Sequence, residues 1–396
     1  MVTREAVITR PIRVLHVAGG MDCTGGVQTG LMNLLRNATG GEFEMHFLVD
    51  EDRSYDYEEE IARLGGKMLA CTNPRNPCLY ARNFAEVVRS YGPYDIVHAH
   101  VGFRGGFICK LAHREKVPVR IVHSHDAFDN VNSTIRRRLY VALQKRWIDR
   151  YATHGIGVSE KATEVMFGPR WQSDPRWRTM PWCVIDVNAP NGISDRATTL
   201  SEFAIRPDAI VIGHVGRMER QKNPLFILEV AECVCSRSDR TFFLLVGTGS
   251  MLQSMKADLA RRNLEDRVLL AGARRDVHRL MTSAFDLLIL PSLHEGLPVV
   301  LVEAQAAGLP CLISDVITRE VDLVPQLIHR LSLQCPAERW AERILEIVSD
   351  GPKIGRPEAF AVVSNSRYNA TNSAHALTNL YRNAVSHTDR RRQTPR

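Results

Sequence analysis

The pattern of apolar and polar positions predicts two consecutive series of buried strands separated by helices. In the first half of the chain, short apolar runs rich in β-branched residues are typical of buried strands. The expected strands are Ile12–Ala18, 44–50, 66–71, Asp95–His100, Val119–His125 and 153–159. Strands of this kind, alternating with helices, indicate a doubly wound parallel sheet. The segment 167–182 has poor periodicity and is expected to be a loop.

A second series with the same alternation follows. Its expected strands are Ala209–Arg217, Thr241–Gly249, 267–273, Phe285–Ser292 and 310–315, with helices at 224–235 and Pro298–Gly308. Because 396 residues exceed what one core usually serves, we expect domains over residues 1–190 and 191–365. Residues 366–396 are expected to form a closing helix and a basic disordered tail. The predicted fold class is α/β, with two Rossmann-like doubly wound parallel-sheet domains facing each other across a ligand-binding cleft.

Composition narrows the class of protein. The apolar fraction of 44% and the charged fraction of 24% are those of a soluble globular protein. No apolar run reaches the roughly 18 residues of a membrane span, and the charged N-terminus is unlike a signal peptide. Nine cysteines without a regular framework favour reduced thiols and a cytoplasmic location. The net charge of +7 fits a phosphorylated ligand or an anionic membrane, since no nucleic-acid-binding motif is visible.

Part of the positive charge lies on one predicted helix, 135–150. Its apolar stripe is Ile135, Leu139, Leu143 and Trp147, and the basic residues around it are Arg136, Arg137, Arg138, Lys145, Arg146 and Arg150. A basic amphipathic helix can lie on an anionic membrane surface. The alternative is an ordinary surface helix whose apolar stripe packs inward.

Two places on the chain could hold a phosphate group. Gly25 and Gly26 stand between the first strand and the next helix, where a backbone without Cβ can approach an anion at the helix N-terminus. The alternative is that they serve turn geometry alone. In the second half, Glu295 lies at the mouth of the helix that begins near Pro298, and Glu303 lies within that helix. A diphosphate at this N-terminus would place Glu303 near a ribose and Glu295 near a sugar on the far side.

These residues belong to motifs that resemble the retaining family-4 glycosyltransferases of GT-B fold (group 1 glycosyltransferases), and above all their capsular and exopolysaccharide enzymes. The motifs are E-x7-E within HEGLPVVLVEAQAAGLP, VGRMERQKN, LLVGTGS and VAGGMDCTGGVQTGLMNLLRN, and counterparts run through nearly the whole chain. Where this family often has aspartate after PNGI, the chain has Ser194.

The resemblance implies a role for each matching residue. Arg217 and Lys222 neutralise the leaving nucleotide diphosphate in place of a metal, Glu295 contacts the donor sugar and Glu303 binds the ribose. The implied donor-binding residues are Gly25, Gly26, Gly216, Arg217, Lys222, Gly272, Arg274, Glu295, Gly296, Leu297 and Glu303, and the implied catalytic residues are His125, Glu295, Arg217 and Lys222. Arg274 and Arg275 could instead be solvated side chains.

The histidines leave alternatives open. The resemblance places one histidine near the transferred sugar, and we match it to His125, with His123 as the second choice. His98 and His100 share one face of their strand and could be structural. The D-x-D sequence at Asp50–Asp52 is assigned no metal.

The expected function is therefore transfer of a hexose-type sugar from a nucleotide-sugar donor, favouring UDP, with retention of anomeric configuration. The expected acceptor is lipid-linked or a saccharide, and the expected location is cytoplasmic, with peripheral binding to the inner face of the membrane. No cofactor, metal or nucleic acid is expected. The alternatives are a sugar-nucleotide epimerase of the same fold, a transferase acting on a small soluble acceptor, and a binding protein that has lost catalysis.

Overall fold

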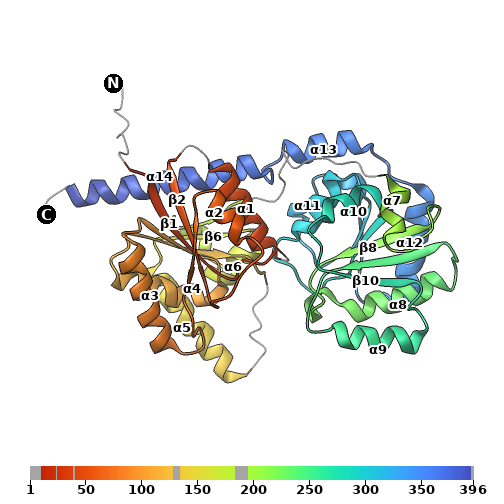
Figure 1. Ribbon diagram of the computed structural model, residues 1–396, viewed down its shortest axis with the longest axis horizontal. Coiled ribbons are helices and arrows are strands. Elements are labelled where there is room, and N and C mark those ends of the chain that lie inside the picture. Colours follow the sequence, from red (N-terminus) through yellow and green to blue (C-terminus); the bar gives the residue numbers. More distant parts are fainter. Residues whose placement is uncertain (1–9, 24, 39–40, 128–133, 183–194, 394–396) are drawn as a thin grey trace. The chain divides into compact units, whose positions relative to one another are not determined.

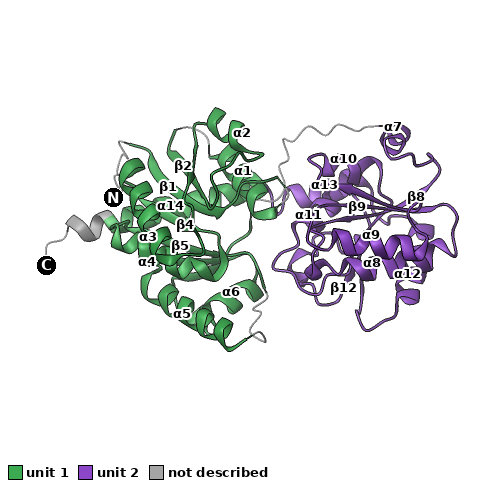
Figure 2. Ribbon diagram, turned by 60° about the horizontal axis from the view of Figure 1, so that its bottom comes forward, with its two compact units in different colours: residues 1–183, 370–396 green, residues 184–369 purple. Residues whose placement is uncertain are grey.

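The computed structural model describes residues 10–23, 25–38, 41–127, 134–182 and 195–393. The chain forms two compact units, coloured separately in Figure 2: Met1–Cys183 together with Ala370–Arg396, and Val184–Asn369. The domain boundary expected near residue 190, like Ser194, lies outside the described residues. The C-terminal segment belongs to the first unit, although it follows the second in sequence.

Unit 1 is built on a sheet of seven parallel strands in the order β3-β2-β1-β4-β5-β6-β7. The strands are β1 Ile12–Gly19, β2 Phe43–Val49, β3 Lys67–Ala70, β4 Ile96–Ala99, β5 Val119–Ser124, β6 His154–Gly157 and β7 Trp177–Thr179. The helices are α1 Gly26–Asn37, α2 Glu58–Arg63, α3 Pro77–Tyr91, α4 Gly105–Arg114, α5 Ile135–Tyr151, α6 Glu160–Phe167 and α14 Ala370–Gln393. Helices α3 and α4 cover one face of the sheet, and α1 and α14 lie on the other (Figure 1).

Local chemistry explains several boundaries in this unit. The Asn76 side chain accepts hydrogen bonds from two backbone N–H groups of the first turn of α3, and Pro77 occupies a position where helices tolerate proline. The expectation of a loop over 167–182 is wrong in part, because β7 pairs with β6 in that segment. Three residues are too few to show a strand period, but the Trp177 ring stacks on Phe167 at 4.6 Å and anchors the strand.

Unit 2 has a sheet of six parallel strands in the order β10-β9-β8-β11-β12-β13. The strands are β8 Ile210–Val215, β9 Thr241–Val246, β10 Val268–Gly272, β11 Leu287–Leu290, β12 Cys311–Ser314 and β13 Ile328–Leu331. The helices are α7 Arg196–Ser201, α8 Pro224–Cys235, α9 Leu252–Arg262, α10 Val277–Ser283, α11 Val299–Ala306, α12 Ala337–Asp350 and α13 Arg356–Ser364. One hydrophobic core of this unit lies between the sheet and helices α8, α9 and α12 (Figure 1).

Helix α14 returns the chain to unit 1 and packs against it. Thr371 donates a hydrogen bond to Asn37 at the end of α1, and Arg382 forms an ion pair with Glu42. The helix continues to Gln393, so the expectation of a disordered tail from His387 onward is wrong for most of that segment. No Gly or Pro interrupts residues 386–393, which lets the helix continue.

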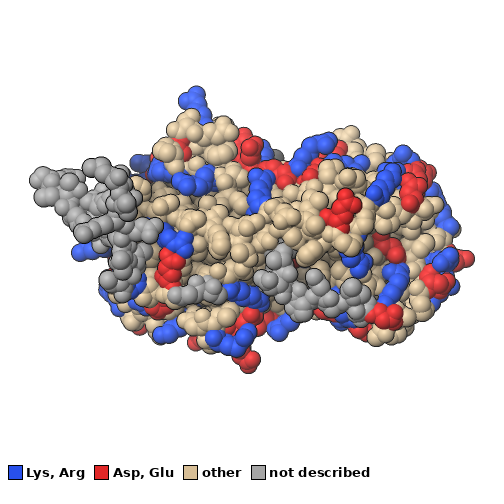
Figure 3. Space-filling view, turned by 90° about the horizontal axis from the view of Figure 1, so that it is seen from above, with Lys and Arg blue, Asp and Glu red and all other residues tan. Residues whose placement is uncertain are grey.

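Two surface properties complete the description. None of the described helices combines the length and the apolar character needed to cross a bilayer. On the side seen in Figure 3, lysine and arginine side chains alternate with acidic ones, so the positive charge is not gathered there.

Candidate active site

Most of the sequence-predicted site residues of unit 2 lie in two loops at one end of its sheet. Strands β8 and β11 are neighbours, but the chain reaches β9 and β10 on one side before it returns to β11 on the other. In doubly wound sheets, ligands bind in the crevice where the strand order reverses in this way. The loop after β8 carries Gly216, Arg217 and Lys222, and the loop after β11 carries Glu295 and leads into α11.

The two loops are joined by an ion pair between Lys222 and Glu295. The Lys222 ammonium lies 2.5 Å from Glu295 Oε1, and the side chains are only 14% and 5% exposed. Gln221 supports the contact, since its side-chain amide donates to the carbonyl of His294 at 3.0 Å. Its own carbonyl accepts from the Leu293 N–H at 2.8 Å. Sequence analysis gave Lys222 and Glu295 separate roles and missed Gln221, while the structure brings all three together.

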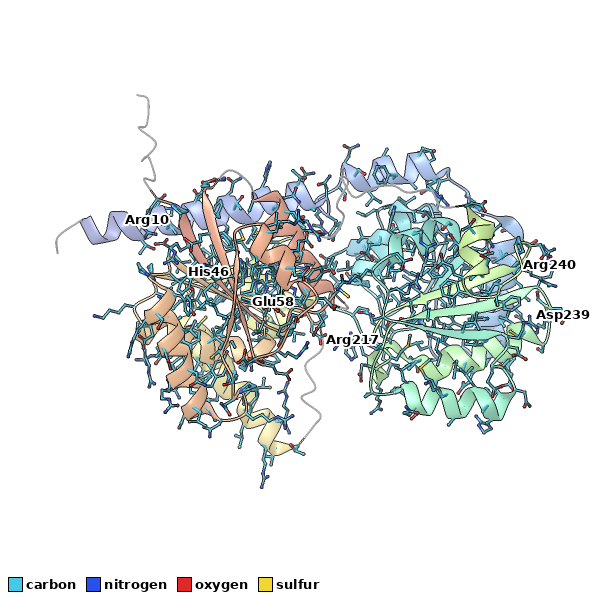
Figure 4. The ribbon with its side chains drawn as sticks, viewed as in Figure 1. Arg10, His46, Glu58, Arg217, Asp239 and Arg240 are labelled. Atoms are coloured by element: carbon cyan, nitrogen blue, oxygen red, sulfur yellow. The ribbon has the colours of Figure 1, made fainter. Side chains whose placement is uncertain are left out.

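Arg217 is the free cation of this group. It is exposed and forms no ion pair with a carboxylate in the part of the chain that the structure describes. Figure 4 shows it in the loop after β8, at the end of the unit 2 sheet. Hydrogen bonds from Ser250 and the charge of Arg217 lower the pKa of the neighbouring Glu219 carboxyl. An anion approaching this edge would meet the exposed Arg217 guanidinium and a Lys222 ammonium already paired with Glu295.

Glycines let the loops after β8 and β9 pack backbone against backbone. A Cβ on Gly247 would lie 1.9 Å from the carbonyl oxygen of Gly216, and Gly247 has φ of +139°. A Cβ on Gly216 would lie 3.2 Å from Cε of Lys222. Gly216 therefore leaves room for the lysine. Gly247 was not among the predicted site residues, although it lies in the quoted motif LLVGTGS.

Glu303 lies on α11 with its carboxylate unpartnered. The residue is partly buried, and its side chain has no hydrogen-bond partner among the described residues. Burial raises the pKa of Glu303 to about 7, because a buried carboxylate is less stable than the neutral acid. Gly296 and Leu297 are buried at the entrance to the same helix. A carboxylate without a partner at this position is suited to accept hydrogen bonds from hydroxyl groups of a ligand.

The loop after β10 is held mainly by its own charges. Gly272 has φ of +67°, and Arg274 donates to Asp276 at 2.7 Å. Arg274 also lies 3.4 Å from Glu202. Hydrogen bonds from Arg274 and Arg279 lower the pKa of Asp276. The Arg274 guanidinium is thus engaged within unit 2 rather than solvated or turned to an open surface.

In unit 1, the glycine turn before α1 is tied to Trp182. Gly25 precedes the helix in an extended conformation with φ of −118°. The Trp182 ring N–H donates to the carbonyl of Gly26 at 3.0 Å. A Cβ on Gly30 would lie 2.0 Å from the same ring nitrogen. Trp182 therefore positions the start of α1, a role with no sequence signal, because the tryptophan lies in a segment without periodicity and far from α1 in sequence.

The same tryptophan covers a cluster of five histidines at the ends of β1, β4 and β5: His16, His98, His100, His123 and His125. Register explains the cluster, because His16 lies opposite His98 in the pairing of β1 with β4. Two hydrogen bonds run through it, His16 Nδ1 to His100 Nε2 at 3.1 Å and His100 Nδ1 to His125 Nε2 at 3.0 Å. His98 and His100 are buried members of this cluster, and His98 Nδ1 also lies 2.7 Å from the Tyr381 hydroxyl.

His125 links the cluster to a pocket of about 210 Å³ in unit 1. The lining residues are Val101, Gly102, Phe103, Arg104, Ser124, His125, Asp126, Arg137, Tyr140, Val165 and Met166. Burial lowers the pKa of His125 to about 3, so its imidazole is neutral at pH 7. Arg104 is paired with Asp50 at 2.7 Å, which accounts for one carboxylate of the D-x-D sequence.

Comparison with known proteins identifies both units. Residues 195–361 match the family model of glycosyl transferases group 1, and residues 25–168 match the glycosyl transferase 4-like domain. Over 373 residues, the chain is 36% identical to EpsF of Bacillus subtilis (strain 168), which is named as a glycosyltransferase, covering 93% of this chain and 96% of EpsF.

A second relative is an Escherichia coli enzyme named UDP-Gal:alpha-D-GlcNAc-diphosphoundecaprenol alpha-1,3-galactosyltransferase. It is 29% identical over 231 residues, covering 56% of this chain and 58% of that enzyme. Among solved structures, Anabaena Alr3699/HepE in complex with UDP and glucose matches with a TM-score of 0.76 at 18% identity, over 93% and 99% of the two chains. WaaG, a glycosyltransferase involved in lipopolysaccharide biosynthesis, matches with a TM-score of 0.65 at 17% identity, over 95% and 98%.

The structural matches show the fold of the chain, and the sequence matches show its family. Both agree with the two parallel α/β sheets described above. The chain therefore belongs to the group 1 glycosyltransferases, and it has the GT-B fold.

Proposed function

We propose that this glycosyltransferase moves a hexose from a UDP-sugar to a lipid-linked saccharide, with retention of anomeric configuration, in the synthesis of a cell-surface polysaccharide. The Escherichia coli relative is named for a UDP-galactose donor and a diphosphoundecaprenol-linked acceptor. The Anabaena protein was crystallised with UDP and glucose. These names support the proposed donor and acceptor classes.

The observation that carries the proposal is the charge arrangement between β8 and α11. The Arg217 side chain is exposed and can bind an anion, and Glu295 holds Lys222 in place through an ion pair. Breaking the bond between the anomeric carbon and the diphosphate leaves negative charge on the phosphate oxygens. Two cations placed in advance stabilise that charge as it develops. We therefore propose that the transfer requires no metal ion at the diphosphate.

Each remaining residue has a part in this proposal. Glu303 accepts hydrogen bonds from the ribose hydroxyls, and Glu295 accepts one from a hydroxyl of the donor sugar while it holds Lys222. The neutral His125 imidazole faces the pocket of unit 1, where we place the acceptor. The acceptor hydroxyl forms the new bond to the anomeric carbon, and its proton leaves with the diphosphate.

The proposed site of action is the inner surface of the cytoplasmic membrane, and helix α5 is the proposed contact. Three of the four stripe residues do not pack inward, since Ile135 is 66%, Leu139 64% and Leu143 44% exposed, whereas Trp147 packs against Phe107. The buried side of the helix is instead Val141, Gln144 and Ile148. With 100° between successive residues, these two sides are nearly opposite.

Charge favours an anionic bilayer as the partner of this exposed face. Arg136, Arg138 and Arg146 are exposed on α5. Each basic side chain near an anionic leaflet contributes about 1 kcal/mol, and salt weakens the attraction. The triple variant of these arginines to glutamine should therefore sediment less with anionic vesicles. A matched control changes exposed Arg63, Arg82 and Arg114, elsewhere on unit 1, to glutamine. Equal loss in both variants, or no vesicle binding by the wild type at low salt, would contradict a specific role for α5.

The direct test of the function is a donor and acceptor screen with product analysis. The purified protein is incubated with UDP- and GDP-sugars and a diphosphopolyprenyl-linked saccharide, and nucleotide release is measured with and without acceptor. We expect acceptor-dependent UDP release and a product whose anomeric configuration, measured by NMR, matches that of the donor. Inversion would contradict the proposed stereochemistry. Interconversion of UDP-sugars without any acceptor would indicate the epimerase instead.

A further inference from the structure

The histidine cluster of unit 1 holds more ring nitrogens than its hydrogen bonds use. Within the cluster, four buried imidazole nitrogens have no hydrogen-bond partner among the described residues: Nε2 of His16, Nε2 of His98, and both nitrogens of His123. A neutral imidazole has one N–H donor and one lone pair. Buried polar groups in native proteins are nearly always satisfied, so an unpartnered one calls for a ligand, a water or an ion.

His123 is the most informative member. It is 1% exposed and lies between His98 and His125, with ring centroids 5.2 Å and 4.1 Å away. The Trp182 ring meets it edge-on at 4.9 Å. No donor or acceptor on the surrounding described elements reaches either of its nitrogens. The described part of the chain therefore leaves both nitrogens of this buried imidazole open to a ligand, a water or an ion.

We propose that His100, His123 and His125 bind one divalent transition-metal ion of the zinc class. One ligand atom from each of these three residues lies within 4.8 Å of the other two. Tetrahedral zinc with bonds of about 2.0–2.1 Å to nitrogen places its ligand nitrogens about 3.4 Å apart. His100 Nδ1 and His125 Nε2 are already 3.0 Å apart, so small rotations of the rings would admit the ion. Imidazole is a ligand that suits zinc, copper and nickel.

Access from the pocket and the availability of a further ligand favour this triad over the neighbouring group of three histidines. His16, His98 and His100 also bring ligand atoms within 4.8 Å, but all three are buried, and an ion among them would have no route to an anionic fourth ligand. His125 is only partly buried and lines the 210 Å³ pocket together with Ser124 and Asp126. A water or an acceptor oxygen from this pocket could complete the coordination, as in zinc sites with three histidines.

Metal binding at one ring nitrogen of His125 leaves the other nitrogen available for the proposed transfer reaction. Its Nε2 is the atom near His100, so metal binding there fixes the proton on Nδ1. His125 would then present an N–H donor toward the pocket. This proposal departs from the sequence-based expectation that the protein binds no metal. It lies on unit 1, whereas the two cations proposed for the diphosphate lie on unit 2.

Metal content tests this inference without any enzyme assay. The full chain, purified without a histidine tag, is loaded with Zn²⁺ or Co²⁺, dialysed, and analysed for metal by mass spectrometry. We expect about one ion per chain, and visible bands of tetrahedral cobalt in the Co²⁺ form. His123→Asn should weaken Zn²⁺ binding by at least about 100-fold in a chelator competition. His113→Asn, which changes an exposed histidine of α4, should bind as the wild type does.

Two further measurements keep the outcome clear. Circular dichroism establishes that His123→Asn is folded, and if it is not, the cobalt spectrum of the wild type still decides. His16→Asn separates the two triads, because His16 belongs only to the neighbouring one. Failure of the wild type to retain metal, or retention by His123→Asn, would overturn the site. If His16→Asn loses the metal and His123→Asn retains it, the ion binds at His16, His98 and His100, and the proposed site is wrong.

Discussion

Breaking the ion pair between Lys222 and Glu295 should cost more stability than any surface substitution nearby. The change is Lys222→Met, which keeps the length of the side chain and removes its charge. The pair is 2.5 Å apart and almost enclosed. Removing one partner of a buried pair costs about 3–5 kcal/mol, because the remaining charge is left uncompensated. We take the lower end, about 3 kcal/mol, since the lysine keeps some contact with water.

This free energy translates into a measurable change in melting temperature. For a unit of this size, 1 kcal/mol corresponds to about 2–4 °C, so Lys222→Met should melt about 6–12 °C lower than the wild type. Glu295→Gln should have a similar effect. The double variant should lose clearly less than the sum of the two, since it leaves no isolated charge. The measurement is thermal unfolding followed by circular dichroism, with urea unfolding as a second probe.

Arg217→Met is the matched control for this series. Arg217 is exposed and unpaired, so its loss should change the free energy of unfolding by less than about 0.5 kcal/mol. The same variant should lose about 1.5–3 kcal/mol of UDP affinity, the range for a hydrogen bond to a charged group. Single variants at Lys222 and Glu295 that cost less than about 0.5 kcal/mol, or whose effects simply add, would refute the reasoning.

Three further predictions concern other parts of the site. UDP affinity should rise about tenfold between pH 6 and pH 8, because the ribose hydroxyls are expected to bind the ionised carboxylate and the pKa of Glu303 is about 7. The rise is measured by calorimetry relative to the Glu303→Gln variant, and equal pH profiles in the two proteins would contradict the prediction. Gly30→Ala should destabilise the wild type in urea unfolding but much less in a Trp182→Ala background, where its Cβ meets no ring. Turnover should not change with added Mg²⁺ or Mn²⁺, and a rate proportional to either ion would show that Arg217 and Lys222 are insufficient.

Much of the fold could be predicted from the sequence because apolar runs of parallel strands are continuous. The pattern correctly places the two series of strands. It also places the helix that begins at Gly26 and the helix that contains Glu303. Strands β7 and β13 were missed: β7 has only three residues, and His329 and Arg330 interrupt the apolar run of β13. The pattern of α5 was misleading for a different reason. Its buried face includes Gln144, whose side-chain carbonyl accepts from the Phe107 N–H at 2.9 Å, so the apolar stripe alone did not show which side packs inward.

Contacts between distant loops could not be predicted in the same way. The motif residues Lys222 and Glu295 were each recognised, but they are far apart in sequence, and their contact depends on the adjacency of β8 and β11. The histidine cluster depends likewise on register. Alternation places His98 with His100 on one face of a strand, but only the pairing of β1 with β4 brings His16 beside them.

The two units place opposite kinds of chemistry at equivalent points of the same topology. In each sheet, candidate residues gather where the strand order reverses: on β1, β4 and the adjoining β5 in unit 1, and in the loops after β8 and β11 in unit 2. Unit 2 gathers formal charges there, with Arg217, Lys222 and Glu295. Unit 1 gathers imidazoles whose pKa values burial lowers, so that they are neutral at pH 7. A leaving diphosphate needs cations, whereas a sugar hydroxyl can also be bound by neutral donors and acceptors such as imidazole. This difference in charge agrees with the proposal that unit 2 binds the donor diphosphate and unit 1 binds the acceptor.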